Sequence, residues 1–387
     1  MHADVVIIGG GVIGSAAAYF LRSHRRECSV IVIERDPSYA LASTPRASGG
    51  VRRLFSLPEN IALSNYSIPF FERFESDMAV EGEPARIGFK KGGYLFIVPP
   101  SSIDVLAQNF ETQTAHGVHA VWLDPKGLKE TFPSMVVDDL GAGVLSPDDG
   151  WLDPHGVLQG FRKKSRAMGA TFAADEVVGI QVSGKVARSV ELKSGGRIGA
   201  GVVINACGAW AKQICAMVGW RIPIEPMRRY EHYFETEELI EPLPYIKDVN
   251  RLAFRPEGKG YSGGVPTLDE PRGFNFDVDH RYFESVVWPA LAARFRQFER
   301  TRERSVMAGL YDQNELDASP IIGSWTDNIE NMYLMAGFSG HGLMHAPGCG
   351  RAIAELILDG AYQTIDLSRF GWKRVIENRP HAERGII

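Results

Sequence analysis

The stretch DVVIIGGGVIGSAAAYFLRSHRRECSVIVIERD, residues 4–36, decides the fold of this chain. It begins with an apolar run, Val5–Ile8, which has the length of a buried strand. A glycine-rich turn follows, and then the alanine-rich stretch Ser15–Arg22, which favours a helix. A second apolar run, Val30–Ile33, ends at Glu34. Strand, loop, helix and strand in this order predict a βαβ unit that binds a dinucleotide.

The glycine-rich turn follows the G-x-G-x-x-G pattern, with Gly9, Gly11 and Gly14 at its fixed positions. The first glycine allows a tight turn, the second lets the backbone approach a pyrophosphate, and the third lets the helix pack closely on the strand. The N-terminus of the helix offers free N–H groups to the phosphates. Glu34 stands roughly 20 residues further on, where it can accept hydrogen bonds from ribose hydroxyls. A carboxylate there excludes the 2′-phosphate of NADP, whereas NAD and FAD both remain open.

Length and charge exclude several classes of protein. The 387 residues suffice for two or three domains, and the formal charge of -5 gives no reason to expect a nucleic acid or an anionic membrane as partner. The first apolar run is too short to cross a membrane, and no basic signal-peptide segment precedes it. We therefore expect a cytoplasmic protein without a membrane span, and a homodimer is compatible with these features.

The four cysteines are scattered along the chain, at Cys28, Cys207, Cys215 and Cys349. They form no CxxC motif and have no spacing typical of metal ligands. This usage is typical of a reducing compartment, so we expect no structural disulfide and no metal site.

Hydrophobic periodicity predicts the remaining elements. We expect strands at 92–98, 141–146, Val202–Asn205 and Met332–Ala336, a hairpin within 170–210, and helices at 102–116, 150–170 and Gly350–Leu358. Asp153 and Pro154 introduce the second of these helices, because proline is tolerated in a first helical turn. The small-residue turn at Cys207–Ala209 is read either as a simple strand-to-helix turn or as a contact with the cofactor.

Two further segments contain residues suited to ligands. Residues 41–57, LASTPRASGGVRRLFSL, have small residues that suit backbone running along a cofactor, and a polar surface loop is the alternative. Between 221 and 309, arginines alternate with aromatic residues, among them Arg228, Arg229, Arg255, Tyr230, Tyr233 and Tyr261. Arginines with aromatic walls suit a small anion, although a single arginine in such a stretch is more often a surface ion-pair partner.

A second glycine-rich stretch, GFSGHGLMHAPGCG, occupies residues 337–350. It is either an ordinary loop before a C-terminal helix or a loop that closes the cofactor site from the other end of the chain. The two interpretations favour different cofactors, because an NAD-binding chain is expected to continue its βαβ pattern directly after residue 36.

Five segments together resemble the D-amino-acid oxidase superfamily: GGGVIG (9–14), STPRASGGVRRLFSLPENIALS (43–64), GWLDPHGVLQGF (150–161), VINACGAWA (203–211) and GFSGHGLMHAPGCGRAIAELI (337–357). Within it, the chain is similar to the sarcosine oxidase and glycine oxidase branch. FSLPENIALS, VDHRYFESVVWPALAARFRQFE and DLSRF are similar to the FAD-dependent oxidoreductase-domain proteins that include a mitochondrial complex I assembly factor. The similarity runs through essentially the whole chain.

The resemblance implies FAD and an α/β fold, in which a Rossmann-like FAD-binding domain is interleaved with an α+β substrate domain built on a mostly antiparallel sheet. It assigns 1–85, 150–220 and 310–387 to the FAD domain and 86–149 and 221–309 to the substrate domain. In this family, the matching segments lie along the pyrophosphate and flavin ring, meet the adenine, or hold the pyrimidine edge of the flavin. With the fingerprint, the expected cofactor residues are Gly9, Gly11, Val12, Ile13, Gly14, Glu34, Arg35, Ser43, Thr44, Ser48, Gly49, Val177, Ala206, Gly208, Gly337, Gly340, His341, Gly342, Leu343 and Met344.

Three departures from the family pattern affect the expected chemistry. Gly309 stands where monomeric sarcosine oxidases carry the cysteine that links the flavin, so FAD is expected to be held noncovalently. A lysine that helps to bind the substrate carboxylate falls on Met344, which leaves Arg52, with Arg255 as its partner. The lysine associated with oxygen reactivity falls on Tyr261, so the electron acceptor is either O2 or another molecule.

The resemblance implies oxidation of the C–N bond of a small amino acid, in particular an N-substituted glycine such as sarcosine, dimethylglycine or iminodiacetate. Hydride transfer to flavin N5 gives an imine that water hydrolyses. The expected catalytic residues are Arg52, Arg255, His341, Tyr261 and His232. His341 is read either as a flavin contact or as a packed residue that shapes its loop. The alternatives are a flavin-bearing assembly or interaction protein with little turnover, and an NAD-dependent dehydrogenase.

Overall fold

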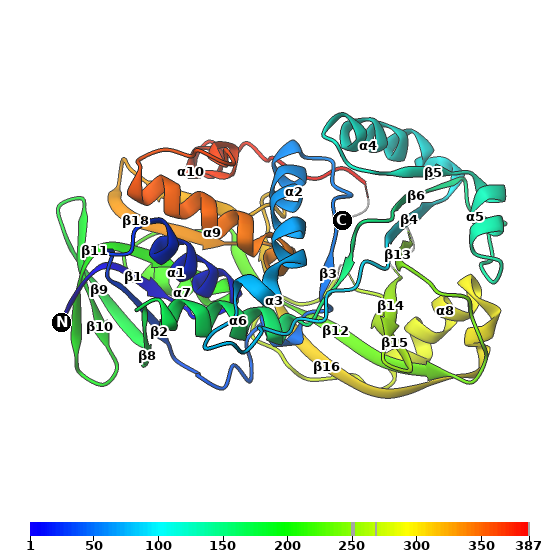
Figure 1. Ribbon diagram of the computed structural model, residues 1–387, viewed down its shortest axis with the longest axis horizontal. Coiled ribbons are helices and arrows are strands. Elements are labelled where there is room, and N and C mark those ends of the chain that lie inside the picture. Colours follow the sequence, from blue (N-terminus) through cyan, green and yellow to red (C-terminus); the bar gives the residue numbers. More distant parts are fainter. Residues whose placement is uncertain (249–251, 268, 386–387) are drawn as a thin grey trace.

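Two eight-stranded sheets lie side by side along the long axis of the protein (Figure 1). The computed structural model describes residues 1–248, 252–267 and 269–385. The strands of the first sheet all come from segments 1–85, 150–220 and 310–387, and those of the second from the remainder together with the end of one long strand. The domain limits themselves stay a prediction.

The first sheet has the order β17-β18-β11-β1-β2-β8, and a hairpin of β9 and β10 extends from β11. Its strands are β1 (His2–Ile8), β2 (Val30–Glu34), β8 (Thr171–Ala174), β9 (Val177–Ser183), β10 (Val186–Leu192), β11 (Arg197–Asn205), β17 (Ile321–Trp325) and β18 (Ile329–Ala336). The central strands are parallel, because β1 pairs in parallel with β2 on one side and with β11 on the other. With α1 (Val12–His24) between β1 and β2, the predicted βαβ unit is confirmed.

Four helices cover one face of this sheet, and α1 and α9 (Gly342–Leu358) lie side by side in Figure 1. The other two are α2 (Pro58–Glu72) and α6 (Pro154–Ala167). Asp153 caps α6, because its side chain accepts a hydrogen bond from the N–H of His155 at 2.9 Å. This cap confirms the expected start of the helix.

The second sheet has the order β16-β12-β15-β14-β13-β4-β6-β5, and all neighbours are antiparallel except β13 and β4. Its strands are β4 (Tyr94–Val98), β5 (Val121–Leu123), β6 (Ala142–Ser146), β12 (Ile224–Thr236), β13 (Tyr245–Asp248), β14 (Ala253–Glu257), β15 (Gly260–Gly264) and β16 (Thr301–Asn314). A mostly antiparallel second sheet beside a sheet whose central strands are parallel confirms the predicted fold class.

Short elements join and flank the two sheets. Between them, β3 (Gly50–Val51) pairs with β7 (Gly150–Trp151). The remaining helices are α3 (Phe74–Asp77), α4 (Ile103–Ala115), α5 (Pro125–Thr131), α7 (Ala211–Ala216), α8 (Trp288–Arg294) and α10 (Trp372–Ile376). Among the described residues, none of these helices has the length and apolarity needed to cross a bilayer.

The predicted start of the C-terminal helix at Gly350 is wrong, because α9 begins at Gly342. The glycines that suggested a loop instead let the helix approach its neighbours. A Cβ on Gly348 would lie 2.7 Å from Leu63 of α2, and one on Gly350 would lie 3.0 Å from the backbone of Ala16 in α1. Tertiary packing therefore accounts for the small residues of this helix.

Candidate functional site

Two adjoining cavities lie between the sheets and form the candidate site. The first has a volume of about 240 Å³ and reaches from the βαβ turn to β16. The second has a volume of about 880 Å³ and extends over the second sheet. Six residues line both cavities, namely Arg46, Ala47, Arg229, Tyr311, Gly340 and Leu343. A long ligand can therefore occupy the first cavity and reach into the second.

The βαβ turn gives the first cavity a backbone wall. Gly9 has a φ of +97°, and a Cβ there would lie 2.6 Å from the carbonyl oxygen of Ala206. A Cβ on Gly14 would lie 2.0 Å from the carbonyl oxygen of Gly9, so Gly14 serves helix packing and does not line the cavity. Gly11, in contrast, has no atom closer than 3.9 Å to its Cβ position and faces the open space. The cradle has the shape that a pyrophosphate requires.

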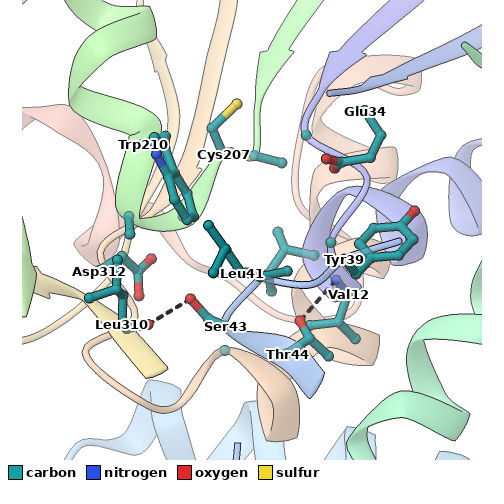
Figure 2. Close-up of a pocket in the computed structure, with 18 of the residues that line it drawn as sticks. Val12, Glu34, Tyr39, Leu41, Ser43, Thr44, Cys207, Trp210, Leu310 and Asp312 are labelled. Carbon is teal, nitrogen blue, oxygen red and sulfur yellow. Dashed lines mark hydrogen bonds between the residues drawn. The ribbon is translucent and has the colours of Figure 1, made fainter. Parts of the chain in front are cut away.

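Glu34 ends β2 at the rim of the first cavity (Figure 2). Its carboxylate accepts hydrogen bonds from the N–H of Gly10 at 2.8 Å and of Asp36 at 2.9 Å. Burial raises the pKa of Glu34, against the lowering effect of these two bonds. Each carboxylate oxygen can accept one more hydrogen bond, so the side chain can still accept from hydroxyl groups of a ribose.

The segment after β2 forms a second wall of this cavity. Thr44 accepts a hydrogen bond through Oγ1 from the N–H of Val12 at 3.3 Å, and Ser43 donates from Oγ to the carbonyl of Leu310 at 2.6 Å (Figure 2). These bonds tie residues 43–44 to α1 on one side and to β16 on the other. Residues 43–44 therefore line the cavity. Of the two interpretations of the segment 41–57, this favours backbone that runs along a cofactor over a polar surface loop.

The turn after β11 forms the third wall, and Trp210 and Asp312 lie across the cavity from Glu34 in Figure 2, with Cys207 between Trp210 and Glu34. The guanidinium of Arg35 lies 4.2 Å from the centre of the Trp210 ring, a cation–π contact that fixes both side chains. Of the two open interpretations of the turn at Cys207–Ala209, the structure favours a contact with the ligand, because all three residues line the cavity.

The loop Gly337–His341 joins the two cavities and is attached to β16. The N–H of Gly337 donates to Oδ2 of Asp312 at 2.7 Å, and Ser339 accepts through Oγ from the N–H of Asn314 at 3.0 Å. Burial raises the pKa of Asp312 to about 6, against the effect of these backbone hydrogen bonds. The loop therefore closes the site from the C-terminal end of the chain, one of the two interpretations that the sequence left open.

Arg52 and His341 form a buried polar contact beside the second cavity. Only 1% of Arg52 is exposed, and its guanidinium donates to Nε2 of His341 at 3.0 Å and to the carbonyl of Leu54. The ring of Phe55 lies 4.0 Å from Cζ of Arg52. Burial lowers the pKa of His341 well below its usual value, and the charges of Arg52 and Lys247 lower it further. His341 is therefore a neutral imidazole that accepts a hydrogen bond from the arginine.

Most predicted cofactor residues line one of the two cavities. Those around the first are Gly9, Gly11, Val12, Ile13, Glu34, Arg35, Ser43, Thr44, Val177, Ala206, Gly208, Gly340, Gly342 and Leu343. Those around the second are Ser48, Gly49, Gly340, His341, Leu343 and Met344. Gly14 and Gly337 line neither, since both are packed against backbone or side chains.

Arg255, Tyr261 and His232 do not line either cavity. Arg255 donates from Nε to the carbonyl of Ser48 at 2.6 Å and is paired with Glu257. The ring of Tyr261 packs 5.0 Å from that of Phe298 in the core of the second sheet. Nδ1 of His232 lies 2.6 Å from Glu303, and 1% of this histidine is exposed. The strand register turns Tyr261 and His232 away from the site, whereas Arg255 lies on the same face of β14 as the cavity-lining Ala253 and is held by Ser48 and Glu257.

Two charged residues of the second cavity, Glu231 and Lys247, were missed from the sequence. Glu231 lies within β12 and accepts a hydrogen bond from Oγ of Ser262 at 2.6 Å. Burial raises the pKa of Glu231 to about 7. Lys247 lies in β13, in the sequence Tyr245–Asp248. For Lys247 the available signal is a charged residue that follows an apolar pair in a short strand, because lysine is rarely buried without a ligand or a partner.

The cysteines do not provide a nucleophile at the flavin-binding segments. Cys349 is fully buried in α9, and Gly309 lines the first cavity at the position that matched the family's linking cysteine. Cys207 lines the same cavity on the turn after β11, where burial raises its pKa. All four cysteines have free thiols. Within the described ranges, no group of histidine, cysteine and acidic side chains is arranged to hold a metal ion.

Comparisons with known proteins agree with this geometry. A family model described as FAD dependent oxidoreductase matches residues 4–356. The chain is 35% identical to the FAD-dependent oxidoreductase domain-containing protein 1 of Bos taurus, over all of this chain and 87% of the relative. It is 26% identical to the mitochondrial sarcosine dehydrogenase of Homo sapiens, over 92% of this chain and 40% of that protein. The crystal structure of L-proline dehydrogenase from P. horikoshii is similar with a TM-score of 0.88 and 25% identity, over 98% of this chain and 99% of that one.

The match spans nearly the whole chain and includes both glycine-rich loops. The glycine cradle, the carboxylate at the end of β2 and the loop that joins the two cavities fit FAD, a dinucleotide with a ring system at one end. The chain therefore belongs to the DAO family of FAD-dependent oxidoreductases, and it is an enzyme of this class with FAD as its cofactor.

Proposed function

We propose that this protein oxidises the C–N bond of a small amino acid, and that its substrate is an N-substituted glycine. The observation that carries the proposal is Arg52, a buried arginine in a cavity that adjoins the cofactor cavity. Among the described residues, its guanidinium forms no ion pair with a carboxylate. A buried cation without such a partner is costly, and a substrate carboxylate removes that cost. Names of similar proteins, such as sarcosine dehydrogenase, agree with this class.

Arg52 binds the substrate carboxylate and fixes its orientation. The planar guanidinium can donate two parallel hydrogen bonds to one carboxylate, which sets direction as well as affinity. Nε2 of His341 accepts a hydrogen bond from the guanidinium of Arg52. The centres of the Phe55 and Phe96 rings lie 4.0 Å and 5.0 Å from Cζ of Arg52. His341 is thus a positioning residue for Arg52, and its neutral state leaves the positive charge available for substrate.

Glu231 takes the proton of the substrate ammonium group. The amine must be neutral before a hydride can leave the carbon beside it, and a base works best when its pKa lies near the operating pH. Burial raises the pKa of Glu231 to about 7, and this residue lines the same cavity as Arg52. The stacked rings of Tyr94 and Tyr245, with centres 4.4 Å apart, form an aromatic wall that excludes water beside them.

FAD, when bound, supplies the acceptor for the hydride that leaves the carbon beside nitrogen. Glu34 and the cradle of Gly9 and Gly11 would hold its dinucleotide end, and Gly340 and Leu343, which line both cavities, would contact the part that lies between them. Binding is noncovalent in this proposal, because Gly309 offers no side chain for a thioether link. Water then hydrolyses the C=N bond of the product to an amine and an aldehyde or oxo acid.

The test mixes the purified holoprotein anaerobically with sarcosine, dimethylglycine, iminodiacetate, glycine, D-amino acids or proline, and follows the flavin absorbance. We expect an N-substituted glycine to bleach the flavin. The Arg52→Met variant should need about 10- to 100-fold more substrate for half-maximal reduction, because a hydrogen bond to a charged group contributes about 1.5–3 kcal/mol. Arg300→Met, which removes an arginine with 74% of its side chain exposed, is the matched control.

Bleaching by D-amino acids or proline alone would contradict the proposed substrate class. Bleaching by no compound of the panel would favour the other candidate, a flavin-bearing assembly or interaction protein with little turnover. The compounds that bleach the flavin are then tested with O2 or an artificial dye as electron acceptor. The acceptor that restores the absorbance of oxidised flavin is the one that receives the electrons.

A further inference from the structure

The segment 52–57, which carries Arg52, belongs to no helix or strand and joins β3 to α2. Within it, the guanidinium of Arg52 donates to the carbonyl of Leu54, and the centre of the Phe55 ring lies 4.0 Å from Cζ of the arginine. Backbone outside helices and strands must find its hydrogen bonds elsewhere. The direction of Arg52 therefore depends on the groups that hold residues 54–57 in place.

The carboxylate of Glu383 holds the second half of this segment. Its Oε2 accepts hydrogen bonds from the N–H and Oγ of Ser56, both at 2.5 Å. Its Oε1 accepts from the N–H of Leu57 at 3.2 Å and from Nδ2 of Asn60 at 2.6 Å. Hydrogen bonds to an ionised acceptor are roughly twice as strong as those between neutral groups. One carboxylate thus fixes the two backbone N–H groups that directly follow Phe55.

Further hydrogen bonds join this segment to the residue after Glu383 and to α4. The N–H of Arg384 donates to Oγ of Ser56 at 2.7 Å, and Nδ2 of Asn109 in α4 donates to the carbonyl of Arg384 at 2.9 Å. Nε2 of Gln113, also in α4, donates to the carbonyl of Phe55 at 3.1 Å. Both α4 side chains are buried. The segment therefore lies in a fixed position between α4 and residues 383–384.

The first half of the segment is held separately, by the buried carboxylate of Asp149. This group accepts hydrogen bonds from the N–H of Arg53 at 2.7 Å and from its guanidinium at 2.8 Å. Loss of Glu383 would therefore leave the backbone beside Arg52 attached and would release the carbonyl and the ring that contact its guanidinium.

Glu383 itself does not line the second cavity, whereas the next two residues, Arg384 and Gly385, do. Burial lowers the pKa of Arg52, and the charge of Glu383 is among the effects that raise it. Glu383 is therefore near enough to affect Arg52, although it does not contact the cavity directly.

We infer that Glu383 is a positioning residue for the site that binds the substrate carboxylate, and that it acts on Arg52 through the segment 52–57. This inference rests on the proposed function. The glutamate fixes the carbonyl of Leu54 and the ring of Phe55, and these two groups direct the guanidinium of Arg52. Two parallel hydrogen bonds to a substrate carboxylate require such a fixed direction.

The test measures how the holoprotein binds methoxyacetate, which has the shape of sarcosine with an ether oxygen in place of the N–H group. Isothermal titration calorimetry should show about 10-fold weaker binding in Glu383→Gln, because a guanidinium without a fixed direction makes only one of its two hydrogen bonds. In the Arg52→Met background, Glu383→Gln should change the affinity less than about 2-fold, since the effects of two residues that act through one contact are not additive. The FAD content per chain is measured for every variant.

Glu355→Gln is the matched control. Glu355 also accepts hydrogen bonds from two backbone N–H groups, those of Gln363 at 2.8 Å and Thr364 at 2.9 Å, but it lines neither cavity. This variant should lower the melting temperature as Glu383→Gln does, and should change methoxyacetate binding less than about 2-fold. Ser56→Ala, which removes one donor to Glu383, should weaken binding about 3-fold and replaces Glu383→Gln if that variant does not fold.

Unchanged affinity in Glu383→Gln, or in its replacement Ser56→Ala, would overturn the inference. An equal loss in Glu355→Gln, or an equal loss in the Arg52→Met background, would overturn it as well. Absence of methoxyacetate binding in the unchanged protein would contradict the carboxylate site and the inference together.

The failure of the inference is distinct from that of the proposed function. If an N-substituted glycine bleaches the flavin and Glu383→Gln binds methoxyacetate normally, the function stands and the role of Glu383 does not. If methoxyacetate binding depends on Arg52 and Glu383 and no amine bleaches the flavin, the carboxylate site stands and the oxidation does not.

Discussion

Burial of the carboxyl group between β12 and β15 raises the pKa of Glu231 to about 7, so that it loses its proton only near neutral pH. Its single hydrogen bond from Ser262 and the charge of Arg255 lower its pKa less than burial raises it. A carboxyl group with a raised pKa holds a proton in the folded state at pH values where the unfolded chain has lost it. The same property that suits Glu231 to accept a proton from an amine thus costs the protein stability in neutral solution.

We predict that Glu231→Gln stabilises the holoprotein in a pH-dependent way. The pKa of Glu231 is about 7 in the folded state against 4.5 for an ordinary glutamate, so the free energy of unfolding falls as pH rises from about 4.5 to about 7. Glutamine removes this loss. The melting temperature of the variant should exceed that of the unchanged protein more at pH 8 than at pH 5.

Calorimetry at the two pH values provides the measurement, and Glu237→Gln is the control because 71% of that side chain is exposed. An equal difference in melting temperature at pH 5 and pH 8 would show that the ionisation of Glu231 is not shifted.

At the scale of elements, the loop Gly337–His341 and the start of α9 act together. Gly337, Ser339 and Gly340 all have positive φ values, of +83°, +50° and +100°. Such a run of left-handed backbone persists only where the surroundings impose it, and the bonds to Asp312 and Asn314 of β16 provide that constraint. The loop is consequently a rigid part of the cofactor site.

We predict that Gly340→Ala disrupts this loop and Gly342→Ala does not. A Cβ on Gly340 would lie 2.6 Å from the Tyr311 ring and require a left-handed alanine, which costs about 1–3 kcal/mol. A Cβ on Gly342 would lie 3.4 Å from Phe338, an ordinary contact, at the first residue of α9. Gly340→Ala should lower both the FAD content per chain and the melting temperature. Full FAD content in Gly340→Ala would show that the loop can adapt.

At this scale, the sequence predicts an element well when the residues that determine it lie close together in the chain. The βαβ unit follows from apolar runs and glycines that lie within about thirty residues, and its elements were predicted to within a few residues. The start of α9 was predicted wrongly because Gly348 and Gly350 are small so that α9 can pack closely against α2 and α1. Both of these helices are distant in sequence. Arg255 and Lys247 lie on the same face of the second sheet, and contacts that the sequence does not show, from Arg255 to the carbonyl of Ser48 and to Glu257, hold its guanidinium outside the cavity lining.

At the scale of the whole molecule, the C-terminal segment joins distant parts of the chain. The Glu383 carboxylate accepts hydrogen bonds from the N–H and Oγ of Ser56, both at 2.5 Å, from the N–H of Leu57 at 3.2 Å and from Nδ2 of Asn60 at 2.6 Å. These groups lie at the N-terminus of α2, where a carboxylate is favoured by the helix dipole. The next residues, Arg384 and Gly385, line the second cavity.

We predict that Glu383→Ala lowers the free energy of unfolding by about 1.5–3 kcal/mol, because hydrogen bonds to a charged group contribute about that amount. Urea denaturation of the holoprotein provides the measurement. Glu377→Ala is the control, since its partner Arg379 has 76% of its side chain exposed and such pairs contribute little. A change as small as that of the control would mean that the N-terminus of α2 is stable without Glu383.

The position of this segment matters to anyone who engineers the protein. Gly385 lines the second cavity. A purification tag or fusion partner attached directly after this residue would therefore begin beside that cavity. The N-terminus begins at the far end of the first sheet, where β1 starts at His2 (Figure 1), and it is the better point of attachment for kinetic work.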